Sequence, residues 1–119
     1  MTTNAIISII IALGIFNVWI LRFNKSSEYR AGNAKNMNEE FSVYGLSGSF
    51  MKFIGFLKIT LAILLIVGIW VPVASRPSAI GMAILMIGAI FMHVRAKDPP
   101  KKSLPAFTLL VLSLIVAFL

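Results

Sequence analysis

One lysine lies inside an otherwise apolar segment of this chain. In Phe53–Val71 every side chain is apolar or weakly polar except that of Lys58. A charge in lipid is costly, so such a lysine either extends its stem to the membrane surface or faces a protein interior and serves a site. The choice between these two interpretations decides what chemistry the chain can offer.

Three further polar side chains share this depth, one in each of the other apolar segments: Asn17, His93 and Thr108. Together with Lys58 they fall within roughly two helical turns, or ~8 Å, of the same membrane surface. A cation, an amide and an imidazole suit an anionic or carbonyl-bearing headgroup, such as that of a quinone, a fatty acid or a lipid phosphate. His93 could also exchange protons near neutral pH.

Two interpretations of this polar layer stay open. In the first, Lys58 extends to the surface and His93 is hydrated, while the amide and the hydroxyl bond to nearby backbone carbonyls. In the second, Lys58, Asn17 and His93 converge at the mouth of a pocket, with a loop acid, Glu39 or Glu40, as counter-charge. The predicted ligand-binding residues are then Lys58, His93, Asn17, Glu40 and Thr108.

Small residues indicate which helix faces turn inward. Gly55 and Ala62 flank Lys58 at −3 and +4, and Gly81 and Gly88 are seven residues apart in the next apolar segment. Faces of small residues usually pack on protein, so this spacing favours an inward Lys58. We interpret the glycines as packing positions rather than as ligand contacts.

The composition excludes several kinds of chemistry. The chain has no cysteine and a single histidine. Disulfide relay, thiol catalysis, a cysteine-bound iron–sulfur cluster and a haem held by two histidines of one chain are therefore excluded. No pattern supplies a nucleophile with its base, a metal cluster or a phosphate loop, so we expect neither a metal site nor stand-alone catalysis.

The elements that must position these residues are membrane helices. Of the 119 residues, 59% are hydrophobic and 13% are charged, and the mean hydropathy is +0.94. Four apolar stretches stand out, and they are Thr3–Leu21, Phe53–Val71, Pro77–Val94 and Leu104–Leu119. At helical rise they span roughly 24 to 29 Å, close to the ~30 Å of a bilayer core. The sequence predicts an all-α integral membrane four-helix bundle, a single domain over residues 1–119.

A short additional helix is expected in the long loop between the first two spans. Asn36 can cap it, with Glu39 three residues later as in a capping box. Met37, Phe41 and Tyr44 then share one face, and the glycine that follows supplies a stop. We interpret this segment as an interfacial helix; the alternative is a solvated loop.

Charge predicts how the bundle is oriented. Nine of the eleven lysines and arginines fall in residues 22–52 and 95–103, and only Arg76 lies in the connection between the second and third spans. The positive-inside rule makes the two basic loops cytoplasmic and places both termini outside, and we expect a bacterial inner (plasma) membrane. The net charge of +7 is thus topological. We expect anionic headgroups rather than nucleic acid as its partner.

Four short patterns follow one another along the chain. They are E-F-x-x-Y-G-L from Glu40, I-G-x-x-K from Ile54, L-L-x-x-G-x-W-x-P from Leu64, and M-x-G-A-x-x-x-H-x-R-x-x-D from Met86. In this order and spacing the chain resembles the DoxX-like family of four-helix membrane proteins, from about Asn38 to its C-terminus. The first span matches only as an apolar segment, and a serine stands where proline often follows the Gly-Leu pair.

The resemblance implies a four-helix transmembrane bundle with recurrent polar positions at Glu40, Lys58 and His93. Relatives include a membrane subunit associated with thiosulfate–quinone oxidoreduction, components of membrane oxidoreductase complexes, and an animal chaperone for receptor assembly. Fold analogy alone does not choose among these roles.

Three functions are therefore weighed. The leading hypothesis is a non-catalytic membrane subunit or binder of a quinone- or lipid-like molecule beside a redox partner, within an oxidoreductase complex. The alternative is an assembly factor or interaction module that packs on another membrane protein or on a second copy of itself. A small transporter or channel comes third, because none of the four spans contains Asp or Glu and the loop charges are strongly biased.

Overall fold

The computed structural model of this chain describes residues 3–27 and 29–119, and the regular elements within these ranges are all helices, without strands. Four helical segments are long and apolar enough to cross a membrane, and they are Thr3–Leu21, Gly48–Val67, Pro72–Arg95 and Pro100–Phe118. The predicted all-α membrane bundle is thus confirmed.

The spans are built from four long helices with short irregular turns at their ends. The helices are α1 (Thr3–Phe16), α3 (Gly48–Val67), α4 (Ser75–Arg95) and α5 (Leu104–Phe118). A π-helical turn, η1 (Asn17–Leu21), follows α1, and 3₁₀ turns precede α4 and α5, namely η2 (Pro72–Ala74) and η3 (Pro100–Ser103). α4 packs most extensively on α5, and α3 packs about as much on α4 as on α1. We call α1 with α3, and α4 with α5, the two helix pairs.

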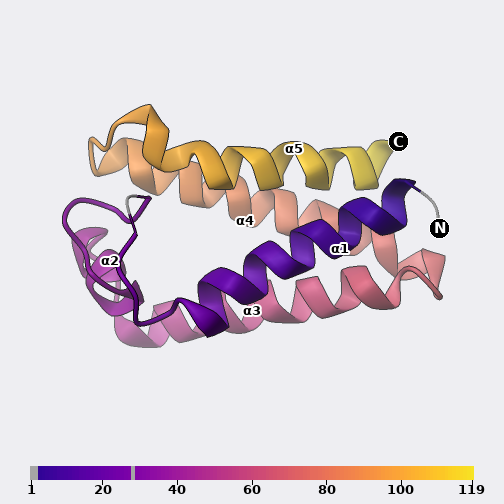
Figure 1. The fold of residues 1–119 in the computed structure, drawn as a ribbon, viewed down its shortest axis with the longest axis horizontal. Helices are drawn as coiled ribbons and strands as arrows, with labels where there is room; N and C mark the ends of the chain where they lie inside the picture. The colour runs from indigo at the N-terminus through magenta and orange to yellow at the C-terminus, as the bar shows by residue number, and fades with distance from the viewer. Residues whose placement is uncertain (1–2, 28) are drawn as a thin grey trace.

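The two ends of the bundle differ, as Figure 1 shows. One end, here called the terminal end, holds both termini and the α3–α4 connection at residues 68–74. The other, the loop end, holds residues 22–47, including the short helix α2 (Met37–Val43), and the α4–α5 connection at residues 96–103. α1 crosses α3 near the loop end and approaches α5 toward the terminal end.

The predicted short helix is present as α2. The side chain of Asn36 accepts a hydrogen bond from the backbone N–H of Glu39 (2.9 Å), as an N-cap does. At the other end Gly45 adopts a left-handed φ of +75°, and the backbone N–H of Leu46 donates to the carbonyl of Phe41. This is the Schellman ending that glycine favours, and it turns the chain back toward α3.

α3 begins five residues earlier in the chain than the sequence indicated. The helix starts at Gly48 rather than at Phe53, because the Oγ of Ser47 accepts from the N–H of Phe50 (3.1 Å) and caps it. It stops at Val67 rather than at Val71, and Gly68 then packs directly against the hydroxyl of Ser75. The fourth span likewise begins earlier, at η3, and α5 stops one residue short of the predicted end.

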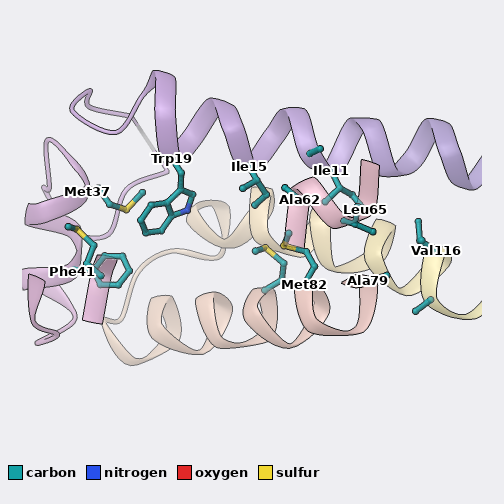
Figure 2. Packing of buried hydrophobic residues seen from close by; sticks show 14 residues of the cluster. Ile11, Ile15, Trp19, Met37, Phe41, Ala62, Leu65, Ala79, Met82 and Val116 are labelled. Atoms are coloured by element: carbon teal, nitrogen blue, oxygen red, sulfur yellow. The ribbon is translucent and has the colours of Figure 1, made fainter. Parts of the chain in front are cut away.

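The bundle is closed by apolar packing along most of its length. Ile11, Leu65 and Met82 are fully buried, and Gly81 brings α4 close to Leu61 of α3. Figure 2 shows the core cluster, in which Ile11, Leu65 and Val116 lie toward the terminal end. The same cluster reaches the loop end through a second group of side chains, Trp19, Met37 and Phe41.

Candidate functional site

A pocket of about 1170 Å³ lies between the two helix pairs at the loop end. Its walls come from all four spans and from α2. All five residues predicted from the sequence line it, and they are Asn17, Glu40, Lys58, His93 and Thr108. Gly14 and Leu109 also line it and are in contact with each other, so the pocket ends where α1 meets α5.

Lys58 faces this pocket. Its side chain is half-buried, and its Nζ lies 5.3 Å from the centre of the Trp19 ring. That geometry is a cation–π contact, which offsets part of the cost of removing the ammonium group from water. Lys58 thus lies in the pocket wall beside an aromatic ring, as in the second interpretation. The predicted counter-charge is not confirmed, because Glu40 pairs with Arg30 and Glu39 is bound to Asn36.

The position of Trp19 follows from a local irregularity and a glycine. In η1 the backbone N–H of Arg22 donates to the carbonyl of Asn17 five residues earlier (2.8 Å), which widens the last turn of the span. The indole then packs on Gly55, where an added Cβ would lie only 2.6 Å from the ring. Gly55 thus serves the site by making room for Trp19, as the small-residue pattern around Lys58 suggested.

Asn17 and Thr108 both line the pocket, but they differ in whether their side chains already have a hydrogen-bond partner. The Thr108 hydroxyl donates to the carbonyl of Leu104 (2.9 Å), one turn back in its own helix. Among the described residues the side-chain amide of Asn17 has no hydrogen-bond partner. Asn17 is therefore the more available of the two for a ligand.

Much of the pocket wall is apolar. Its sides include Ile54 of α3, Ile84 and Leu85 of α4, and Leu109 of α5. Gly88 lies among them, and an added Cβ there would meet nothing within 4 Å. The pocket therefore combines a polar end near α2 with an apolar interior, which is the pattern of sites for amphiphilic small molecules.

A buried ion pair forms the roof of the pocket. Arg30 is 5% exposed, and its Nη1 lies 2.8 Å from the Oε2 of Glu40. Its remaining N–H groups donate to the backbone carbonyls of Lys25 (2.9 Å), Arg22 (2.7 Å) and Phe23 (3.2 Å). With its donors so engaged, this arginine fixes the loop that connects η1 to α2.

Tyr44 extends this network toward α4. Its hydroxyl donates to the Oε1 of Glu40 (3.1 Å) and lies 3.4 Å from the Nε2 of His93. Burial, together with the negative charge of Glu40, raises the pKa of Tyr44 far above its usual value. The phenol therefore stays protonated and remains a hydrogen-bond donor.

His93 is held by the turn that ends α4. Lys97 adopts a left-handed φ of 60°, and the backbone N–H of Asp98 donates to the carbonyl of His93 (3.0 Å), a Schellman ending without glycine. This turn brings the Oδ2 of Asp98 to 2.9 Å from the Nδ1 of His93. The carboxylate orients the ring so that Nε2 faces Tyr44.

Asp98 and Lys102 tie the two helix pairs together. The Oδ1 of Asp98 accepts from the backbone N–H of Gly32 (3.0 Å), and the Nζ of Lys102 donates to the carbonyls of Arg30 (2.7 Å) and Gly32. Burial alone would raise the pKa of Asp98, but these hydrogen bonds, with His93 and the Lys102 charge, hold it below its usual value. We call the six residues Arg30, Glu40, Tyr44, His93, Asp98 and Lys102 the polar network.

The arrangement offers side chains that can hold a ligand. No cluster of three metal-ligating side chains occurs within residues 3–27 and 29–119. The residues that meet at the pocket provide a cation, an amide and a histidine whose ring is held between Asp98 and Tyr44. Such groups can hold and orient a polar head while the apolar wall holds the rest of a ligand.

Trp19 and four residues of the polar network were not among the predicted site residues. Arg30 and Lys102 entered the sequence argument only as topological charges, Asp98 only as part of a short pattern, and Tyr44 through such a pattern and the apolar face of the short helix. An indication existed in the i+5 spacing of Asp98 after His93 next to the end of a helix, since a Schellman turn joins residues at that spacing. No such local pattern pairs Arg30 with Glu40 across ten residues of loop.

Comparison with known proteins gives a family. A model of the DoxX-like family matches residues 6–117, which includes nearly all of the four spans and the whole polar network. Neither a curated protein nor a solved structure matches the chain.

Proposed function

The chain belongs to the DoxX-like family, and from the loop-end pocket of this small membrane protein we propose that it binds a hydrophobic molecule of the quinone or lipid type without transforming it. The observation that carries the proposal is the pocket itself, whose volume of about 1170 Å³ is bounded by an apolar wall and by a polar end that includes Lys58. We further propose that the bundle holds this molecule beside a redox partner. This part of the proposal rests on the family resemblance alone.

Native mass spectrometry of gently extracted protein tests the binding. Wild type should carry an added mass of a lipid or quinone in several mild detergents. Gly88→Leu should lose this mass, because the new side chain fills space within the pocket. Gly48→Leu is the matched control: an added Cβ there also meets nothing within 4 Å, and Gly48 does not line the pocket.

Two outcomes would contradict the proposal. If wild type carries no bound molecule in any of the detergents, the protein does not bind such a ligand. If both leucine variants lose the bound mass equally, the ligand is not bound in the pocket. Recovery of one stoichiometric membrane protein with wild type and with Gly88→Leu alike would instead favour the assembly role.

We also propose that the loop end is cytoplasmic in a bacterial inner membrane, with both termini outside. Support comes from the basic residues, which lie mostly at the loop end. Because the chain has no cysteine, single-cysteine variants can be labelled without background. An impermeant maleimide on intact cells should label Val73→Cys at the terminal end and not Lys35→Cys, and the reverse labelling would invert the topology.

A further inference from the structure

We infer that the molecule held in the loop-end pocket is a long-chain carboxylate, whose negative head pairs with Lys58 and accepts a hydrogen bond from Asn17. The inference rests on the proposed binding function and narrows it, from a hydrophobic molecule to an anionic amphiphile. It follows from the charges around the pocket and from which of them already have partners.

The described acidic side chains all have partners other than Lys58. Glu39 accepts from the amide of its cap residue Asn36 (3.0 Å) and is exposed. Glu40 pairs with Arg30 at 2.8 Å, and Asp98 lies against His93 at 2.9 Å. Across residues 3–27 and 29–119, no carboxylate lies at ion-pair distance from Lys58.

Lys58 is therefore a cation without a counter-ion in the wall of an apolar pocket. Its contact with the face of Trp19 compensates only part of the cost of desolvation. A bound anion would provide the missing charge and accept hydrogen bonds from the ammonium group, and charge-assisted bonds of this kind are the strong ones.

The other charges of the lining act in the same direction. Arg22, Arg30 and Lys102 line the pocket together with Lys58, and Glu40 is the one acidic residue among the described lining residues. The carboxylate of Glu40 is already paired with Arg30. The potential within the pocket is thus positive, which favours an anionic head and opposes a cationic one.

The apolar wall and the free amide define the rest of the ligand. Asn17 lines the same pocket as Lys58, and its amide, unpartnered among the described residues, can donate to an oxygen of the head. The wall formed by Ile54, Ile84 and Leu109 then receives an alkyl chain. A single negative charge is enough to pair with Lys58, so the geometry points to a carboxylate as the head.

Trp19 makes the inference measurable. The chain has two tryptophans, and Trp70 is 76% exposed in the connection at the terminal end. A Trp70→Phe variant would leave Trp19, which touches the pocket and faces Lys58, as the single reporter. The probes are a long-chain carboxylate brominated along its chain and its methyl ester, since bromine quenches indole fluorescence only at short range.

In the Trp70→Phe background, titration at neutral pH should show the carboxylate quenching Trp19 at a concentration about tenfold or more below that of the ester. Lys58→Met should abolish this difference and Lys58→Arg should keep most of it. Lys52→Met, which removes an exposed lysine of the same helix that does not line the pocket, should change nothing. The arginine variant keeps the charge, so it distinguishes the loss of the cation from a loss of folding caused by any substitution at this position.

The remaining outcomes separate the two proposals. If acid and ester quench Trp19 equally in the Trp70→Phe background with Lys58 intact, the pocket binds an apolar chain, and the inference of an anionic head is wrong. If the preference for the acid survives Lys58→Met, Lys58 is not the head site and the inference fails. If neither probe quenches Trp19 in wild type, the pocket does not take such molecules, and the proposed function fails with the inference.

Discussion

The two ends of the bundle are stabilised by different interactions. At the terminal end the helices meet through fully buried apolar side chains such as Leu65 and Met82, and Gly81 allows α4 to approach Leu61 closely. At the loop end the two helix pairs are joined by the polar network, with hydrogen bonds that run from residues 30–44 to residues 93–102. The pocket lies at the second end, where side chains do not fill the space between the pairs.

This difference shows how a small bundle can keep a cavity. Four spans of about 20 residues cannot both pack tightly along their whole length and enclose a large site. Here packing at the terminal end holds the pairs together, while the polar network fixes their separation at the loop end. Changes at one end should therefore leave the other largely intact, and the following predictions test that independence.

The largest effect is expected from Arg30→Ala. The substitution leaves the Glu40 carboxylate buried without its partner and removes the donors from three backbone carbonyls. Breaking a buried pair in this way costs about 3 to 5 kcal/mol. Trypsin cleavage within residues 22–36 should become faster on the order of a hundredfold or more, since cleavage follows the population of the open loop. The exposed Lys35→Ala should cause no comparable opening, and equal effects would refute the buried pair as the main restraint.

A somewhat smaller effect, at the opposite end, is expected from Leu65→Ala. Leu65 is fully buried, so its truncation leaves a cavity and costs about 2 to 5 kcal/mol. Thermal unfolding in detergent, followed by circular dichroism, should occur at a lower temperature. Trypsin cleavage within residues 22–36 should stay near the wild-type rate. If that loop opens as much as in Arg30→Ala, the two ends are not independent.

A pair of glycines on one face of α4 sharpens the comparison. In Gly81→Leu the new Cβ would meet Leu61 at 3.1 Å, so the leucine overpacks the interface and should destabilise the bundle by about 1 to 3 kcal/mol. The same change at Gly88 meets open space within the pocket, and removing a helical glycine should leave the unfolding temperature unchanged or slightly raised. Equal destabilisation by both variants would mean that the pocket collapses around Gly88.

The smallest effect concerns Asp98→Asn. The pKa of Asp98 lies below its usual 3.8, so its charge adds stability at every pH above that value, and this contribution disappears as the pH falls through the lowered pKa. Hydrogen exchange of residues 29–34, corrected for intrinsic rates, should therefore lose protection in strong acid. The asparagine variant should start with protection reduced about three- to tenfold and show no acid step. An acid step that persists in it would assign the titration to another group.

The sequence was sufficient for the bundle because its pattern is long and repeated. A run of about 20 apolar residues forms a helix that spans the bilayer, because the helix satisfies its own backbone hydrogen bonds. The cap at Asn36 and the stop at Gly45 are local patterns typical of helix ends. The beginning of α3 was missed because Ser47 is a cap without a strong apolar pattern after it. Phe53 starts the continuous apolar run, but the helix begins where its first free N–H groups find an acceptor.

The site was predictable only in part. Lys58 and His93 stand out because polar groups in apolar segments are rare, and their common depth follows from helical rise. The partners of Glu40 and His93 could not be predicted with the same reasoning. Arg30 lies in an irregular loop whose path depends on tertiary contacts, and Lys97 adopts a left-handed conformation for which an ordinary lysine gives no sequence indication.

The widened turn η1 has a consequence for how such proteins can diverge. Because its hydrogen bond reaches back five residues instead of four, the turn accommodates one residue more than an α-helix would. A deletion of one residue between Asn17 and Leu21 would restore a regular helical turn and change which side chains the turn presents, while α1 and the chain after the turn would keep their register. Which side chain occupies the place of Trp19 in the pocket wall can therefore change by a single insertion or deletion, an evolutionary step that alters the pocket and spares the fold.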